Sequence, residues 1–222
     1  MKDIPIFTGN FGIATLILRE IPTKRYAYVM VRSYQPGKLP EFLQECCDFC
    51  IMAGAVHVIA TADEPLEFLP HVHDMLEFTC RRETLPPPLR PVELVPVTAE
   101  NGQQFVDLYN RLFYPIINAA TYTKTDLARI LKKGQAYLAM VCGEYAGLGE
   151  LTENELSAIG VLPEHRGLGH HLALTLLARM SCEVVRLRVS SVNEPALRLY
   201  GKLGFDRTAV LSRWYRLTPT AE

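Results

Sequence analysis

Residues 159–172 read IGVLPEHRGLGHHL, and this stretch decides how the rest of the chain is interpreted. Its apolar start is typical of a strand, and the glycines at 167 and 169 predict a turn that leads into a helix. The first N–H groups of a helix have no partner within it, and the helix dipole favours negative charge there. We therefore expect a phosphate or pyrophosphate site at this turn. A Gly-x-Gly also occurs at ordinary tight turns, so both interpretations stay open at this point.

The segments on either side predict strands alternating with helices. Apolar residues recur three and four apart in the expected helices, whereas the expected strands are short apolar or alternating runs. Asn193 is expected to cap the last helix and Gly204 to end it. We expect strands at 92–97, 135–142, 146–152, 156–161, 184–189 and 208–217, and helices at 105–113, 125–133, 168–181 and 194–203.

A second stretch, SSVNEPALRLYGKLGF at residues 190–205, strengthens the first. Residues 161–169 fit Val-x-Pro-Glu-x-Arg-Gly-x-Gly, and residues 193–205 fit Asn-x-x-Ala-x-x-Leu-Tyr-x-x-x-Gly-Phe. The two patterns, in this order, resemble motifs A and B of the GCN5-related N-acetyltransferase (GNAT) superfamily. The resemblance covers nearly the whole second half of the chain. It implies an α/β fold with a mixed, mostly antiparallel sheet flanked by helices, occupying residues 91–217.

The resemblance also implies an activity and a donor. A GNAT domain moves an acetyl group from acetyl-CoA directly to an amine, without a covalent enzyme intermediate and without a metal. Strand residues 159–161 would pair with the pantetheine arm, and Asn193 would lie beside the donor. The implied acetyl-CoA-binding residues are Ile159, Gly160, Val161, Arg166, Gly167, Leu168, Gly169, His170, His171 and Asn193.

Three residues are candidates for proton transfer. The resemblance makes Tyr200 the general acid that protonates the departing thiolate, and a phenol can donate such a proton. Tyr200 also lies on the apolar face of its helix, so a core tyrosine is the alternative. An ammonium acceptor must lose a proton before it attacks, and a carboxylate is the usual base. Glu155 is the first candidate for that base and Glu150 the second.

The acceptor is less defined than the donor. By the resemblance, its contacts should come from the loop between the first two helices, including Tyr114, Asn118 and Tyr122. A small-molecule amine is favoured over a protein amine, because the chain has no charged docking segment.

Two departures from the family pattern are visible. His171 occupies a position where Gly or Ala is expected, which supports an alternative in which the domain binds acyl-CoA without catalysis. Arg188 stands where the GNATs that acetylate the N-terminus of a ribosomal protein carry a glutamate, which counts against that acceptor. Transfer of an aminoacyl or longer acyl group by a tandem GNAT fold is a further alternative.

The first half of the chain resembles a degenerate GNAT-like half at residues 1–85, joined by a Pro-rich linker at 86–90. Strands are expected at 13–19, 26–32 and 56–60, and helices at 39–52 and 65–78. The turn that would match the phosphate turn, residues 33–40, contains two prolines, which have no N–H. We therefore expect no acetyl-CoA in this half.

Cysteine spacing and composition exclude several classes of protein. Cys46, Cys47 and Cys50 continue the apolar face of the helix at 39–52, so core packing is favoured over a metal site. The net charge is −1 and no apolar run approaches a membrane span. The start does not read as a signal peptide. We expect a cytoplasmic protein that binds neither nucleic acid nor membrane, and we leave a homodimer open.

Overall fold

The structure is a computed structural model that describes residues 5–219. Its chain divides into two compact units, and each is described by itself. Unit 1 comprises Met1–Met75 and Val210–Glu222, and unit 2 comprises Leu76–Ala209. Two strands, β5 (His71–Arg81) and β11 (Asp206–Arg216), contribute residues to both units.

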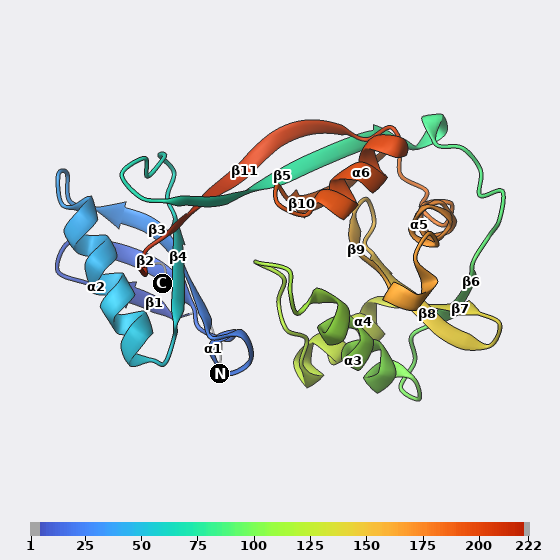
Figure 1. Ribbon diagram of the computed structural model, residues 1–222, viewed down its shortest axis with the longest axis horizontal. Coiled ribbons are helices and arrows are strands. Elements are labelled where there is room, and N and C mark those ends of the chain that lie inside the picture. The colour runs from blue at the N-terminus through green and yellow to red at the C-terminus, as the bar shows by residue number, and fades with distance from the viewer. Residues whose placement is uncertain (1–4, 220–222) are drawn as a thin grey trace. The chain divides into compact units, whose positions relative to one another are not determined.

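Unit 1 is a sheet with one long helix on a face (Figure 1). Strands β2 and β3 are antiparallel, whereas β3 and β4 are parallel and joined through α2. The end of β11 then pairs with β4 at Tyr215↔Ala60. The elements that precede β5 are β1 (Ile6–Thr8), β2 (Gly12–Ile17), α1 (Ile21–Lys24), β3 (Tyr26–Tyr34), α2 (Leu39–Met52) and β4 (His57–Thr61).

The core of unit 1 lies between α2 and the sheet. Cys46, Cys47 and Cys50 are buried there beside Phe42. Burial raises the pKa of the Cys46 and Cys50 thiols to about 12, so both stay protonated near neutral pH. The prediction that this cysteine face packs in the core is confirmed.

Unit 2 is built on a second, antiparallel sheet in the order β6-β7-β8-β9. Cys142 (φ 51°) and Gly143 (φ 83°) both adopt the left-handed backbone that a tight hairpin requires between β7 and β8. The elements of this part are β6 (Glu93–Pro96), α3 (Gly102–Phe113), α4 (Lys124–Lys133), β7 (Ala136–Val141), β8 (Glu144–Leu151), β9 (Leu156–Val161), η2 (Pro163–His165), α5 (Gly169–Leu177), β10 (Val184–Ser190) and α6 (Glu194–Lys202).

Strands β9 and β10 start together and then belong to different sheets. Glu155 and Arg186 form an isolated parallel bridge, and the Arg186 N–H donates to the Asn154 carbonyl at 2.8 Å. Beyond this point β9 is the last strand of its sheet, while β10 is the last strand of the other sheet. Each of these two strands therefore has one edge without a partner strand from the bridge to its carboxyl end.

The sequence predicts a helix at 65–78, and this prediction is wrong because His71–Arg81 forms strand β5. Its buried residues are His73, Leu76 and Cys80, which are three and four apart. That spacing matches a helix face, and it arises here because the strand runs from one unit into the other. The expected β-β-α-β-α order of the first half therefore ends in a strand.

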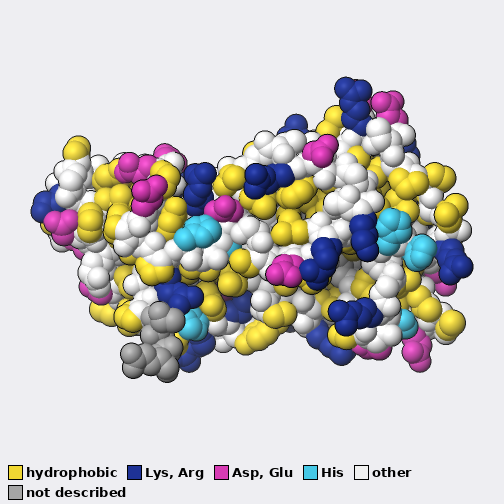
Figure 2. Space-filling model, turned by 45° about the horizontal axis from the view of Figure 1, so that its top comes forward, with side chains coloured by type: hydrophobic (Ala, Val, Ile, Leu, Met, Phe, Trp, Pro, Cys, Tyr) yellow, Lys and Arg dark blue, Asp and Glu magenta, His cyan; other side chains and the backbone are white. Residues whose placement is uncertain are grey.

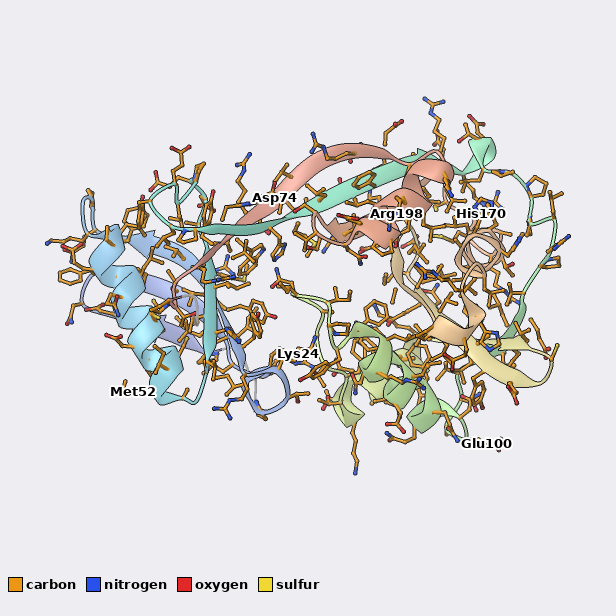
Figure 3. The ribbon with its side chains drawn as sticks, viewed as in Figure 1. Lys24, Met52, Asp74, Glu100, His170 and Arg198 are labelled. Atoms are coloured by element: carbon orange, nitrogen blue, oxygen red, sulfur yellow. The ribbon has the colours of Figure 1, made fainter. Side chains whose placement is uncertain are left out.

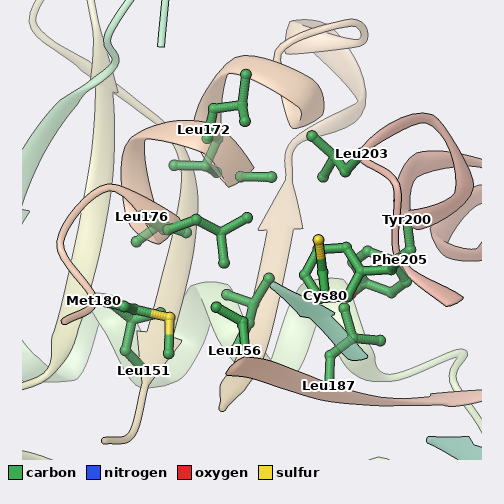
Figure 4. Packing of buried hydrophobic residues seen from close by; sticks show 14 of the residues in the cluster. Cys80, Leu151, Leu156, Leu172, Leu176, Met180, Leu187, Tyr200, Leu203 and Phe205 are labelled. Carbon is green, nitrogen blue, oxygen red and sulfur yellow. The ribbon is translucent and has the colours of Figure 1, made fainter. Parts of the chain in front are cut away.

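Strand β5 has an unusual place in the fold. The order of the seven-stranded sheet is β1-β2-β3-β4-β11-β5-β10, so a strand from the first half of the sequence separates β10 from β11. Leu76 and Cys80 belong to the same buried cluster as α5 and α6 (Figure 4). A short 3-10 helix, η1 (Arg82–Thr84), follows β5. The compact units thus divide within β5, after Met75, rather than at the proline linker at 86–90.

The second-half elements otherwise match those expected from the sequence. Strand β9 has the expected bounds, and Asn193 caps α6 by accepting from the Ala196 N–H at 3.3 Å. The expected α/β class, with a mixed and mostly antiparallel sheet flanked by helices, is confirmed. None of the helices within residues 5–219 is long and apolar enough to cross a membrane.

Candidate active site

The glycine turn leads from β9 into α5. After β9 the chain makes the 3-10 turn η2, and Gly167 then adopts φ +102°, a conformation that side chains disfavour. Helix α5 begins at Gly169, and His170 is labelled at its start in Figure 3. The expected strand, turn and helix are therefore present in order.

Four N–H groups of this turn have no backbone acceptor among the described residues. The Arg166 N–H donates to Pro163 and the Leu168 N–H donates to His165, so these two are used within the turn. The first hydrogen bond of helix α5 is donated by the Leu172 N–H to the Leu168 carbonyl. The N–H groups of Gly167, Gly169, His170 and His171 remain for an anionic ligand.

The turn packs against the helix that carries Tyr200. Outside the neighbouring backbone of its own helix, the nearest heavy atom to a Cβ added at Gly169 would be the Leu199 Cδ2 atom, at 3.9 Å. Leu168 and Leu199 also pack on the same buried cluster. The open space at Gly169 thus borders α6, one residue before Tyr200.

Tyr200 is 6% exposed and lies in the core of unit 2 beside Phe205 (Figure 4). The two ring centroids are 5.9 Å apart. Burial raises the pKa of the Tyr200 phenol, which keeps it protonated at neutral pH. This protonation state suits a general acid, and the burial suits a core residue equally well.

Strand β9 contributes Ile159, Gly160 and Val161, all half-buried. A Cβ at Gly160 would lie 2.8 Å from the Leu112 Cδ1 atom, so α3 packs tightly against this glycine. Because β9 is the last strand of its sheet, one edge of its backbone is left for an extended ligand.

Glu155 lies just before β9 and faces an arginine. Its Oε1 atom is 3.7 Å from the Nε atom of Arg188, and its side chain is 25% exposed. Water can therefore reach this carboxylate.

Glu150 is placed very differently, because it is buried and both of its oxygens accept hydrogen bonds. The Tyr122 hydroxyl donates to Oε2 at 2.7 Å, and Arg129 Nη1 donates to Oε1 at 2.8 Å. The Tyr122 ring stacks on Tyr109 with centroids 3.6 Å apart. Burial, together with the neighbouring Tyr109 and Glu150, raises the pKa of Tyr122.

The three expected acceptor residues are in different surroundings. Tyr114 ends α3 and is 56% exposed, and Asn118 adopts φ 67° in the loop. Tyr122 is held by Asn110, whose side chain bonds both its N–H, at 2.7 Å, and its carbonyl, at 3.0 Å. The sequence did not predict roles for Arg129, Tyr109 and Asn110. Only the fold brings Arg129 to Glu150, and Tyr109 and Asn110 to Tyr122.

Residues 101–205 match the family described as Acetyltransferase (GNAT) family. Residues 101–205 are therefore identified as a GNAT domain, and the rest of the chain lies outside this match. Among curated proteins, the N-alpha-acetyltransferase RimI of Mycobacterium tuberculosis is 38% identical over 81 residues, which is 33% of this chain. The matched part covers 51% of that relative, so the chain spans about half of its length.

Solved structures share the fold of this chain at low sequence identity. A GCN5-related N-acetyltransferase from Sphaerobacter thermophilus has a TM-score of 0.64 and 16% identity, over 95% of this chain and 78% of its own. A GCN5-related N-acetyltransferase from Kribbella flavida has a TM-score of 0.63 and 14% identity, over 98% of this chain and 91% of its own. A tandem GNAT protein from the clavulanic acid biosynthesis pathway has a TM-score of 0.56 and 17% identity, over 99% and 85%.

Proposed function

We propose that the GNAT domain transfers an acetyl group from acetyl-CoA to an amine. One juxtaposition carries the proposal: the glycine turn with its four available N–H groups abuts the helix that carries Tyr200. Pyrophosphate fits the first feature, because backbone N–H groups at a helix start bind anions. The second feature supports Tyr200 as the proton donor, because it follows Leu199, which packs near Gly169.

Different residues would bind the donor and transfer the protons. The N–H groups of Gly167, Gly169, His170 and His171 hold the donor phosphates, and the free edge of β9 pairs with the extended arm. The neutral amine attacks the thioester carbonyl, a C–N bond forms, and the C–S bond breaks. Tyr200 gives its proton to the departing thiolate, and the base takes the proton that the amine loses.

Glu155 is our candidate for the base. Its carboxylate is partly exposed, so it can accept a proton directly or through water. Glu150 is the weaker candidate, since the Tyr122 hydroxyl and Arg129 already occupy both of its oxygens. We propose that Glu150 instead fixes the end of the loop between α3 and α4.

The acceptor is a small-molecule or protein amine. The curated relative is an N-alpha-acetyltransferase, which supports a terminal amine of a peptide. Arg188, paired with Glu155, stands where the ribosomal-protein acetylases carry glutamate, which supports a different acceptor. On the face seen in Figure 2, side chains of both charges occur, and several of the dark blue ones lie close together on the right.

An acyl-transfer assay with an amine panel tests the proposal. The full chain is incubated with acetyl-CoA and, separately, with longer acyl-CoA thioesters. The acceptors are free amino acids, polyamines, and peptides with free or blocked N-termini. Thiol release that requires one amine class, with the acylated product seen by mass spectrometry, supports transfer. Donor binding by calorimetry without transfer to any amine would instead support a non-catalytic acyl-CoA-binding module.

A further inference from the structure

A cavity of about 250 Å³ lies in unit 1, whereas the residues assigned above belong to unit 2. It is open to solvent, because most of its lining side chains are exposed. Strands β3 and β4 are parallel from Tyr26↔His57 to Met30↔Thr61, and the cavity begins where this pairing ends. On the other side, β4 pairs with β11 only at Ala60 and Ile59. Residues 210–213 of β11 therefore run past the end of β4, and a space opens between the strands.

Side chains of opposite charge line this space without pairing to each other. Arg32 comes from β3 and Arg213 from β11, whereas Asp63 and Glu64 follow β4. No ion pair joins these arginines to these carboxylates within residues 5–219. Both charges are thus available to a ligand.

Two of the charged groups are held in place by neighbouring strands. Arg32 Nε donates to Thr15 Oγ1 at 2.9 Å, which leaves both terminal nitrogens of the guanidinium for another acceptor. The Tyr34 hydroxyl donates to the Glu64 carboxylate. The remaining wall includes apolar side chains, among them Met30, Ala62 and Leu211.

We propose that this cavity binds a free α-amino acid with an apolar side chain. Its carboxylate would lie on the guanidinium groups of Arg32 and Arg213, and its ammonium group on Asp63 and Glu64. A neutral ligand would form no ion pair with any of these four side chains, and an ion of one sign would be repelled by the two side chains of like charge. The volume is below the roughly 300–1,000 Å³ usual for drug-sized ligands, so the occupant is small.

Calorimetry on the full chain, without acetyl-CoA, tests the proposal. Each of the twenty L-amino acids is titrated, and the strongest binder is then compared with its methyl ester and its N-acetyl derivative. Each derivative removes one charge, so the affinity for each should be lower by about tenfold or more, as expected for a lost charged hydrogen bond. No binding by any amino acid, or equal binding of the ester, overturns the proposal.

Matched variants locate the site. Arg32→Gln and Asp63→Asn should each weaken binding about tenfold or more. Arg25→Gln and Glu67→Gln are controls, because both side chains are exposed in unit 1 and neither lines the cavity. Equal weakening in a control and its partner variant would overturn the placement. Melting temperatures establish that each variant is folded. If a variant does not fold, the comparison with the methyl ester and the N-acetyl derivative still tests the proposal on the parent chain.

Discussion

Tyr200 combines a phenol with a fully packed ring, and one substitution separates its two candidate roles. Tyr200→Phe keeps the ring against Phe205 and removes only the hydroxyl. If the phenol protonates the thiolate, kcat should fall about 10²–10⁴-fold, while acetyl-CoA affinity hardly changes. Steady-state kinetics and calorimetry on the same preparation measure both. Unchanged turnover would leave Tyr200 as a core residue.

The raised pKa of Tyr200 also predicts a response of stability to alkali. Above pH about 10, the ordinary tyrosine pKa, the unfolded chain loses a phenol proton that the folded chain keeps. The free energy of unfolding should therefore fall as pH rises beyond that point. Urea titrations between pH 9 and 11 should show a smaller fall for Tyr200→Phe than for the parent chain. An identical fall would mean that Tyr200 titrates normally in the fold.

Two glutamates with different surroundings should respond differently to the same substitution. Glu155→Gln should lower kcat with little change in melting temperature, since this side chain is partly exposed. Glu150→Gln removes the buried partner of Arg129 and should cost about 1–3 kcal/mol of stability. Glu153→Gln is the exposed control. A stable, inactive Glu150→Gln protein would make Glu150 the base instead.

At the scale of elements, the glycine turn offers a direct test of donor binding. Gly169→Asp adds a carboxylate at a position where no atom outside the local helix backbone comes closer than 3.9 Å to the new Cβ, so the fold should tolerate it. The negative charge should weaken acetyl-CoA binding roughly tenfold or more, because the turn would otherwise hold phosphates. Calorimetry and thermal melting provide the two measurements.

Gly201→Asp is the matched control for this substitution, since Gly201 in α6 also has open space around it. It should leave acetyl-CoA affinity near that of the parent chain. If both aspartates weaken binding equally, or neither does, the assignment of the turn to the donor phosphates fails.

Local sequence patterns predicted most elements because their causes are local. The Asn193 cap and the buried cysteine face depend on residues within one or two turns of helix. The error at 65–78 arose because the burial of β5 is set by distant partners along the chain. The cluster of Tyr109, Arg129 and Glu150 could not be predicted for the same reason, although the glutamate itself was identified.

At the scale of the whole molecule, we expect that the chain cannot be divided at the linker into two parts that fold separately. A fragment of residues 90–222 would lack β5, and with it Leu76 and Cys80 of the unit 2 core. We expect it to be unfolded or aggregated, because the facing edges of β10 and β11 would be unpaired. Circular dichroism and size-exclusion chromatography would show this. A cooperative melt with normal acetyl-CoA affinity would contradict it.

Cleavage of the intact chain at the linker is the matched experiment. Leu89 is 89% exposed, so a protease site placed at 86–90 should be accessible. The two pieces should stay together as a folded complex, since β5 keeps its neighbours in the sheet. Separation of the pieces under native conditions would mean that β5 contributes little to stability.

Strand β11 is the last element to be translated, and this has a consequence for folding during synthesis. Tyr215 of this strand belongs to the unit 1 core, whose other buried residues are translated before unit 2. The nascent unit 1 must therefore wait, with one edge of β4 unpaired, until all of unit 2 has been synthesised. A chain that ends before β11 lacks part of both units, and we expect it to be degraded faster than the full chain.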